Sequence, residues 1–176
     1  MNTSLPLVYL SFLIFLLALV AGLVVRQVFK TRKVESTLSK LQKKLSQEKG
    51  TAQEYYQLGS IYLDKKLFTQ AIVQFQKALK CKEEIEDENK ALIYNGLGYA
   101  YVAQEQYDLA VRQYKEALKL YPEYVTAWNN LAFAYDRKKL TAQALEAYEE
   151  ALKLDPDNQT AKKRAESLRK RLPTTA

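Results

Sequence analysis

Three segments of the chain decide its fold: AQEYYQLGSIYLDKKLFTQAIVQFQKAL (52–79), ALIYNGLGYAYVAQEQYDLAVRQYKEAL (91–118) and VTAWNNLAFAYDRKKLTAQALEAYEEAL (125–152). Aligned from their first residues, all three have an aromatic residue in place 4, Leu in place 7, a small residue in place 8 and Tyr in place 11. Ala recurs in places 20 and 27, and an aromatic residue in place 24. Such self-similarity at a fixed period is typical of a repeat protein, in which each unit packs only on its neighbours.

Each segment predicts a pair of helices, which in the first repeat fall at about 52–65 and 68–81. Small residues in places 8, 20 and 27 allow the paired helices to approach closely, and the aromatic residues fill the space between them. The residues from Thr51 to Glu54 match a capping box, which would start the first helix. These positions resemble the tetratricopeptide repeat (TPR). The resemblance implies an all-α fold, a TPR helical solenoid of three helix-turn-helix repeats at 52–85, 91–124 and 125–156 within residues 51–156.

The ends of the solenoid and the spacing of its repeats need separate explanations. Residues 157–176 predict a C-terminal capping helix and tail, because the last repeat cannot leave its apolar face uncovered. The basic residues of this helix are expected to be solvated; the alternative is a contact surface for an acidic partner or a lipid.

The repeat starts lie 39 and 34 residues apart, so five extra residues fall within 80–90. There Glu86, Asp87 and Glu88 favour the N-terminus of the next helix, with an acidic recognition loop as the alternative.

The N-terminal segment predicts one transmembrane helix, an anchor within residues 1–29. Residues 3–25 carry no charged side chain, and about 20 apolar helical residues span a bilayer of about 30 Å. A cleaved signal peptide is the alternative, but no Lys or Arg precedes the apolar run, and Leu19 occupies the −3 position of the best cleavage site, after Ala21. Basic residues crowd the C-terminal flank, from Arg26 to Lys33. The positive-inside rule therefore predicts that the repeats stay on the cytosolic or stromal side.

Residues 30–50 predict a basic juxtamembrane helix that links the anchor to the repeats. Val34, Leu38, Leu41 and Leu45 recur at spacings of 4, 3 and 4 residues, which is a helical stripe. We expect the helix to continue the anchor and lie near anionic headgroups. The alternative is dimerisation through the stripe as a short coiled coil.

Composition excludes several classes of function. The chain has no His and a single Cys, Cys81, so His-ligated metal sites, imidazole-based catalysis and an intramolecular disulfide are excluded. No Gly-rich phosphate loop is present, so we expect neither an enzyme nor a cofactor. Charge is +6 in residues 26–50, −3 in 51–156 and +4 in 157–176. Because the repeats are mildly acidic, we expect no nucleic-acid binding.

The TPR resemblance implies a partner-binding groove on the concave face, lined by places 2, 5, 9 and 12 of each first helix. Together with one adjacent amide residue, the candidates are Gln53, Tyr56, Ser60, Leu63, Leu92, Asn95, Tyr99, Val102, Thr126, Asn129, Asn130, Phe133 and Asp136. Aromatic faces and amides suit a peptide segment with apolar anchors, its backbone bonded by the three Asn residues. The alternative is that some of these side chains pack against the capping helix. Aromatic residues on the signature places, Trp128 among them, are expected in the core.

One class of partner is not expected. TPR proteins that hold the acidic C-terminal tails of heat-shock chaperones use a basic clamp, with Lys in place 5 and Asn in place 9 of the first repeat. This chain has Tyr56 and Ser60 there, while Arg137 and Lys138 lie just beyond the groove places of the third repeat. A heat-shock chaperone clamp is therefore not predicted.

The layout as a whole resembles the small thylakoid-anchored TPR proteins of cyanobacteria and algal plastids that are implicated in photosystem I assembly. The segments 129–135 and 142–150 add to this resemblance. It implies a single-pass thylakoid protein that binds a photosystem I subunit or another assembly factor. The alternative is a membrane-docked receptor or adaptor in protein trafficking, secretion or another membrane complex.

Overall fold

A computed structural model describes residues 4–172, so residues 1–3 of the predicted anchor and 173–176 of the predicted tail lie outside the described residues. All regular structure within 4–172 is helical. The helices are α1 (Ser4–Gln47), α2 (Ala52–Asp64), α3 (Phe68–Leu79), α4 (Asp87–Ala103), α5 (Tyr107–Leu120), α6 (Val125–Arg137), α7 (Thr141–Leu154) and α8 (Gln159–Arg169). The chain forms two compact units, residues 1–48 and 49–176. The predicted all-α TPR solenoid is confirmed.

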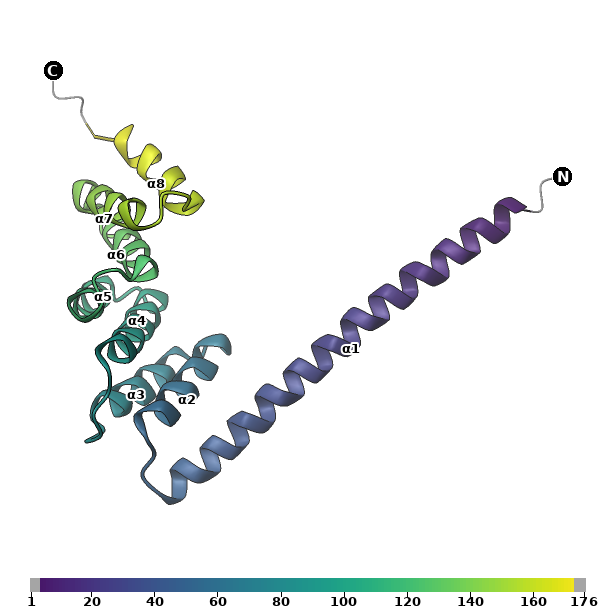
Figure 1. Ribbon diagram of the computed structural model, residues 1–176, viewed down its shortest axis with the longest axis horizontal. Coiled ribbons are helices and arrows are strands. Elements are labelled where there is room, and N and C mark those ends of the chain that lie inside the picture. Colours follow the sequence, from purple (N-terminus) through teal and green to yellow (C-terminus); the bar gives the residue numbers. More distant parts are fainter. Residues whose placement is uncertain (1–3, 173–176) are drawn as a thin grey trace. The chain divides into compact units, whose positions relative to one another are not determined.

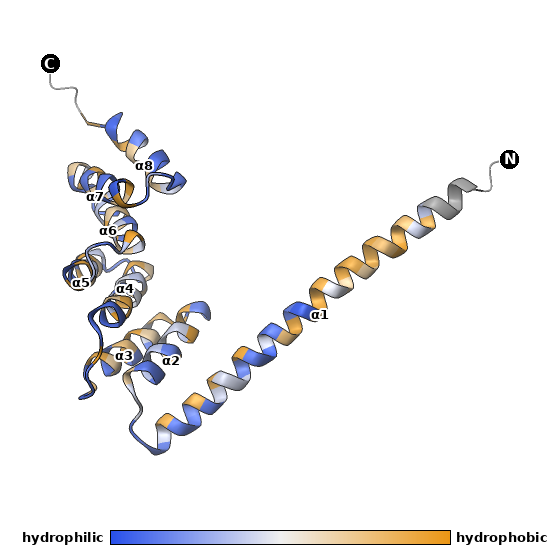
Figure 2. Ribbon diagram, viewed as in Figure 1, coloured by the Kyte–Doolittle hydropathy of each residue, from blue (hydrophilic) through white to orange (hydrophobic). Residues whose placement is uncertain are grey.

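The first unit is a single continuous helix, α1. Figure 2 shows that its N-terminal part is apolar, whereas its C-terminal part mixes hydrophilic and apolar residues. The apolar part is long enough to cross a membrane, and none of its apolar window is buried. Phe12 and Phe15, for example, are 65% and 66% exposed. A run of exposed apolar side chains this long is unfavourable in water and matches lipid surroundings. The stripe from Val34 to Leu45 is helical, as its spacing predicts.

The second unit stacks helix pairs in chain order, α2 with α3, α4 with α5 and α6 with α7, and ends at α8 (Figure 1). The second helix of each pair also packs on the first helix of the next. The predicted capping box starts α2: the amide of Glu54 donates to Thr51 Oγ1 at 3.2 Å, and the amide of Thr51 donates to Glu54 Oε2 at 3.0 Å. Two of the otherwise unpaired donors at the helix start are thereby satisfied.

Large rings on the second helices and small residues on the first helices form the core. Phe75, Tyr114 and Tyr148, which occupy place 24, are 0%, 1% and 2% exposed. A Cβ atom added at Gly98 would lie 2.4 Å from Tyr114 Cε1, and one at Gly59 would lie 2.8 Å from Phe75 Cε1. The rings therefore occupy the space that a larger residue in place 8 would need. Close packing of this kind is what makes cores intolerant of added atoms.

The turns within the three repeats share one backbone conformation. Lys66, Glu105 and Lys139 have φ values of 59°, 59° and 61°, the left-handed region that favours Gly. In the first repeat the amide of Lys66 bonds to the carbonyl of Leu63 at 2.8 Å, and the amide of Leu67 bonds to that of Tyr62 at 2.8 Å. The other two turns repeat these bonds. The pattern is a Schellman-type helix end, here formed without Gly.

Four of the five extra residues between repeats one and two lengthen a helix. α4 has 17 residues, whereas α2 and α6 have 13 each. Asp87 and Glu88 lie in the first turn of α4, where their charges complement the helix dipole. The extension therefore places both carboxylates where the sequence predicted a helix N-terminus.

α8 covers the apolar end of the third repeat, as predicted for a capping helix. Ala161, Ala165 and Leu168 are buried, and α8 packs on α7. The Asn158 side chain caps the helix by accepting a hydrogen bond from the amide of Ala161 at 3.0 Å. Arg169 pairs with Glu149 of α7 at 2.7 Å, which adds a polar contact at the edge of the interface.

Candidate functional site: the inner groove

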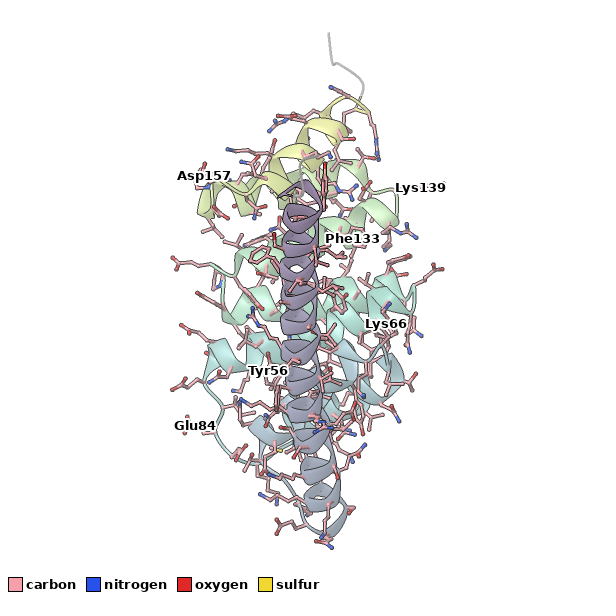
Figure 3. The ribbon with its side chains drawn as sticks, turned by 90° about the vertical axis from the view of Figure 1, so that its right-hand side faces the viewer. Tyr56, Lys66, Glu84, Phe133, Lys139 and Asp157 are labelled. Carbon is pink, nitrogen blue, oxygen red and sulfur yellow. The ribbon has the colours of Figure 1, made fainter. Side chains whose placement is uncertain are left out.

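The first helices of the repeats line a groove of about 570 Å³, called here the inner groove. Eight of the residues predicted for the binding face contribute to it: Tyr56, Ser60, Leu63, Leu92, Asn95, Tyr99, Thr126 and Asn130. They come from α2, α4 and α6. Figure 3 shows Tyr56 and Phe133 on one face of the repeat unit, between an edge with Lys66 and Lys139 and an edge with Glu84 and Asp157. Residues from places 2, 5, 9 and 12 thus line one groove, mainly in the first two repeats, and its role in binding a partner stays a prediction.

Aromatic side chains form much of the wall. Tyr56 packs on Phe75 with ring centroids 5.9 Å apart. Tyr99 is 51% exposed, which leaves a large aromatic surface available to a ligand. Tyr124 also lines the groove and stacks on Tyr121 with a centroid distance of 5.7 Å. Burial raises the pKa of the Tyr124 hydroxyl above its ordinary value, so this group stays a neutral donor and acceptor.

An amide network crosses the middle of the groove. Asn130 Nδ2 donates to Asn95 Oδ1 at 2.9 Å, and Asn95 Nδ2 donates to the Tyr124 hydroxyl at 3.2 Å. The sequence predicts that these amides bond a peptide backbone, but the structure shows that they first bond one another. The second N–H of each amide and the carbonyl of Asn130 remain for a ligand. Because each side chain holds the next, the network fixes their orientation before a ligand arrives.

The structure places the other predicted residues outside this groove. Gln53 lines a separate small cavity of about 80 Å³. Asn129, Val102 and Phe133 are half-buried but do not line the inner groove, and the buried Oδ1 of Asn129 has no hydrogen-bond partner within the described residues. The carboxylate of Asp136 accepts a hydrogen bond from Arg171 Nη1 at 3.1 Å, so the chain itself occupies that position. The third repeat therefore contributes less free surface than the first two.

Several lining residues escape sequence reasoning. Phe68 and Phe75 occupy signature places and are expected in the core, yet both also line the groove. Tyr124 lies in the turn between repeats two and three, and only packing of α6 on α4 brings its hydroxyl to Asn95. Asn95 and Tyr124 lie 29 residues apart, and the repeat signature does not indicate that their side chains meet.

The charges of the groove are few and balanced. Asp64 and Lys66 are the charged residues among its lining side chains. The hydroxyl of Ser60 donates to the backbone carbonyl of Tyr56 at 2.9 Å, so both clamp places carry neutral groups that contact each other. A groove of this composition offers apolar contacts and neutral hydrogen bonds, in contrast to a site that neutralises a strongly charged ligand.

Comparison with known families agrees with the repeat geometry. Two family models, each described as tetratricopeptide repeat, match residues 50–123 and 95–159. The chain belongs to the TPR family, a class of protein-interaction scaffolds. No catalytic family is indicated.

Within the TPR family, the chain is similar to several curated proteins. The chain is 39% identical over 116 residues to "Uncharacterized protein ycf37" of Cyanophora paradoxa, with 66% of each chain covered. It is 33% identical over 127 residues to the ycf37 protein of Guillardia theta, covering 72% of this chain and 71% of that one. It is also 37% identical over 125 residues to "Tetratricopeptide repeat domain-containing protein PYG7, chloroplastic" of Arabidopsis thaliana, covering 71% of this chain and 41% of the relative.

Solved structures share the fold. The crystal structure of MamA has a TM-score of 0.72 at 21% identity, and the match covers 80% of each chain. The first TPR of Spaghetti (RPAP3), solved with the HSP90 peptide SRMEEVD, has a TM-score of 0.63 at 18% identity and covers 68% of this chain and 91% of its own. At these identities the similarity establishes the TPR architecture alone.

Proposed function

We propose that the protein is a membrane-anchored TPR scaffold that binds a protein partner and assists the assembly or stability of photosystem I at the thylakoid membrane. The observation that carries the proposal is the combination, in one chain, of an open aromatic groove and a helix long enough to cross a bilayer. The relation to a chloroplastic TPR protein supports a photosynthetic membrane. The sequence layout supports photosystem I as the complex that is served.

The anchor gives the groove a function that a free TPR domain would lack. A segment bound at Tyr99 and Asn95 would be held close to the membrane in which its complex is built. Tethering of this kind raises the effective concentration of the partner without additional contacts. The basic residues from Arg26 to Lys33 favour a stromal or cytosolic location for the repeats.

Gene deletion tests the function. We expect deletion in the source organism, which must then be an oxygenic phototroph, to lower the ratio of photosystem I to photosystem II. Re-introduction of the full chain should restore the ratio, whereas residues 49–176 without α1 should restore it poorly. An unchanged ratio in low and in high light would contradict the proposal. A secretion or trafficking defect with normal photosystems would favour the membrane-docked receptor instead.

Groove variants test the binding site within the same strain. Tyr56→Ala and Tyr99→Ala remove aromatic surface from the inner groove. Val73→Ala is the matched control, because Val73 is 42% exposed on α3 and does not line the groove. We expect the Tyr variants to fail in complementation and the Val73 variant to succeed, all at equal protein level by immunoblot. Full complementation by both Tyr variants would exclude the inner groove as the site.

A further inference from the structure

A second groove lies on the side of the repeats formed by the second helices, and it is called here the outer groove. Its volume is about 520 Å³. The helices α5 and α7 form its walls, and α6, on which both pack, forms its floor. Trp128, Leu131 and Tyr135 provide the floor, in places 4, 7 and 11 of the third repeat. These places differ from places 2, 5, 9 and 12, so the outer groove is separate from the inner groove.

Trp128 gives this groove an aromatic anchor point. The sequence predicts a core residue, but the structure shows Trp128 half-buried at the groove surface. Its indole N–H already donates to the backbone carbonyl of Pro122 at 2.8 Å. The remaining exposed part of the ring is therefore apolar and contains no unpaired hydrogen-bond donor. Partly exposed Trp residues of this kind are typical anchors of binding surfaces.

The two rims of the outer groove carry opposite charges. The α5 rim presents Lys115 and Lys119, and the α7 rim presents Glu146 and Glu150. The ammonium of Lys115 lies 5.8 Å from the centroid of the Tyr135 ring, which keeps the cation at the groove edge. A ligand with one sign of charge is attracted to one rim and repelled by the other.

Two of these rim charges already have partners along their own helices. Lys119 pairs with Glu116 at 2.6 Å, and Glu150 pairs with Lys153 at 2.5 Å. The Lys119 and Lys153 side chains are each 68% exposed, and exposed pairs of this kind contribute little stability. A charged ligand can therefore replace the partner in either ion pair at little cost in free energy.

We propose that the outer groove binds an amphipathic helix of a partner protein, with an apolar stripe on Trp128, carboxylates facing α5 and cations facing α7. Two helical walls above an apolar floor suit a third helix, which buries one side-chain stripe between them. The opposite rim charges select helices whose two flanks differ in sign. They disfavour an acidic tail, a polybasic segment and a nucleic acid alike.

The only Trp in the chain lies in this groove, so its fluorescence reports occupancy directly. Three Trp-free helical peptides of about 14 residues, or four turns, share one Leu stripe. One has Glu on one flank and Lys on the other, one has Glu on both flanks, and one has Lys on both. Each is titrated against the full chain in nanodiscs while Trp128 emission and its quenching by acrylamide are measured. We expect the mixed peptide to shift the emission to the blue and to bind roughly tenfold more tightly than the others.

Charge reversal on one rim gives the decisive comparison. The variant Lys115→Glu with Lys119→Glu makes both rims acidic, and we expect its preference to change to the peptide with two Lys flanks. The matched control, Lys163→Glu on α8 with Lys170→Glu at its C-terminal cap, changes the net charge equally and should leave the preference unchanged. Comparison at equal lipid concentration removes the effect of peptide bound to the bilayer. Unchanged Trp128 emission, equal binding of all three peptides, or an unchanged preference in the rim variant would each overturn the proposal.

The outcome is independent of the inner groove. Tyr99→Ala should leave the emission shift with the mixed peptide intact, because Tyr99 does not line the outer groove. Loss of the shift in that variant would also overturn the proposal, since it would mean that the peptide occupies the inner groove.

Discussion

The first two repeats and the third repeat carry the same signature but present different surfaces on the inner face. In repeat two, Tyr99 is 51% exposed and available to a ligand. In repeat three, the same place holds the half-buried Phe133, and Asp136 three places further on pairs with Arg171 beyond α8. The side chain of Asp136 is only 17% exposed. The comparison teaches that a segment that follows the last repeat can occupy a position that the repeat signature leaves open.

The residue in place 8 also differs between the first two repeats and the third. A substitution there is expected to have the largest effect on stability. Repeats one and two have Gly59 and Gly98 there, whereas repeat three has Ala132. We expect Gly98→Ala to destabilise the repeat unit by about 2 kcal/mol, because the new Cβ atom would lie 2.4 Å from a buried Tyr114 atom. Thermal denaturation followed by circular dichroism measures the change. Gly22→Ala is the control, since nothing lies within 4 Å of its Cβ position. Equal melting of the Gly98 variant and the wild type would disprove the packing argument.

Affinity for the partner tests whether the first two repeats or the third repeat form the binding site. We expect Tyr99→Ala to weaken partner binding about tenfold, or by about 1.4 kcal/mol, because it removes an exposed aromatic anchor. Phe133→Ala should have little effect, because Phe133 does not line the inner groove. Partner recovery from detergent-solubilised membranes, with helix content checked by circular dichroism, measures both. A larger loss with the Phe133 variant would assign the site to the third repeat.

The turns offer a smaller, stabilising change that should be the same in both regions. Lys139 has a φ of 61°, which is unfavourable for a residue with a side chain. We expect Lys139→Gly to stabilise the protein by about 0.5–1 kcal/mol, because relief of this strain exceeds the added entropy of the unfolded chain. Glu105→Gly in repeat two should give a similar gain, since its φ is 59°. Lower unfolding midpoints in urea for both variants would contradict this account.

The ion pair that occupies the third repeat should matter least for stability. Arg171 and Asp136 lie 3.1 Å apart, but the Arg171 side chain is 54% exposed. We expect Arg171→Ala to cost less than about 1 kcal/mol of unfolding free energy, as for other solvent-exposed pairs. Partner affinity should be unchanged if repeats one and two carry the site. A marked gain in affinity would show that the pair shields a binding surface in repeat three.

Much of the repeat architecture was predictable because its signals are local and periodic. The capping box at Thr51 needs only residues three positions apart, and it is present. The small residues in place 8 predicted close helix contacts, which the rings of Phe75 and Tyr114 make. The lining of the inner groove was predictable in part, because places 5 and 9 of the first two repeats share one side of their helices.

The sequence by itself therefore determined the set of helices, their pairing and the apolar helix α1. It also determined on which side of its helix each repeat position lies. Tertiary structure decided which of those positions are free. Arg171 reaches Asp136 across 35 residues, and Tyr124 reaches Asn95 across 29, only because α8 and α6 pack in particular orientations. Trp128 satisfies the signature of a core residue, yet it lies half-buried between two second helices. Exposure depends on neighbours from other repeats, and a pattern within one repeat carries no information about them.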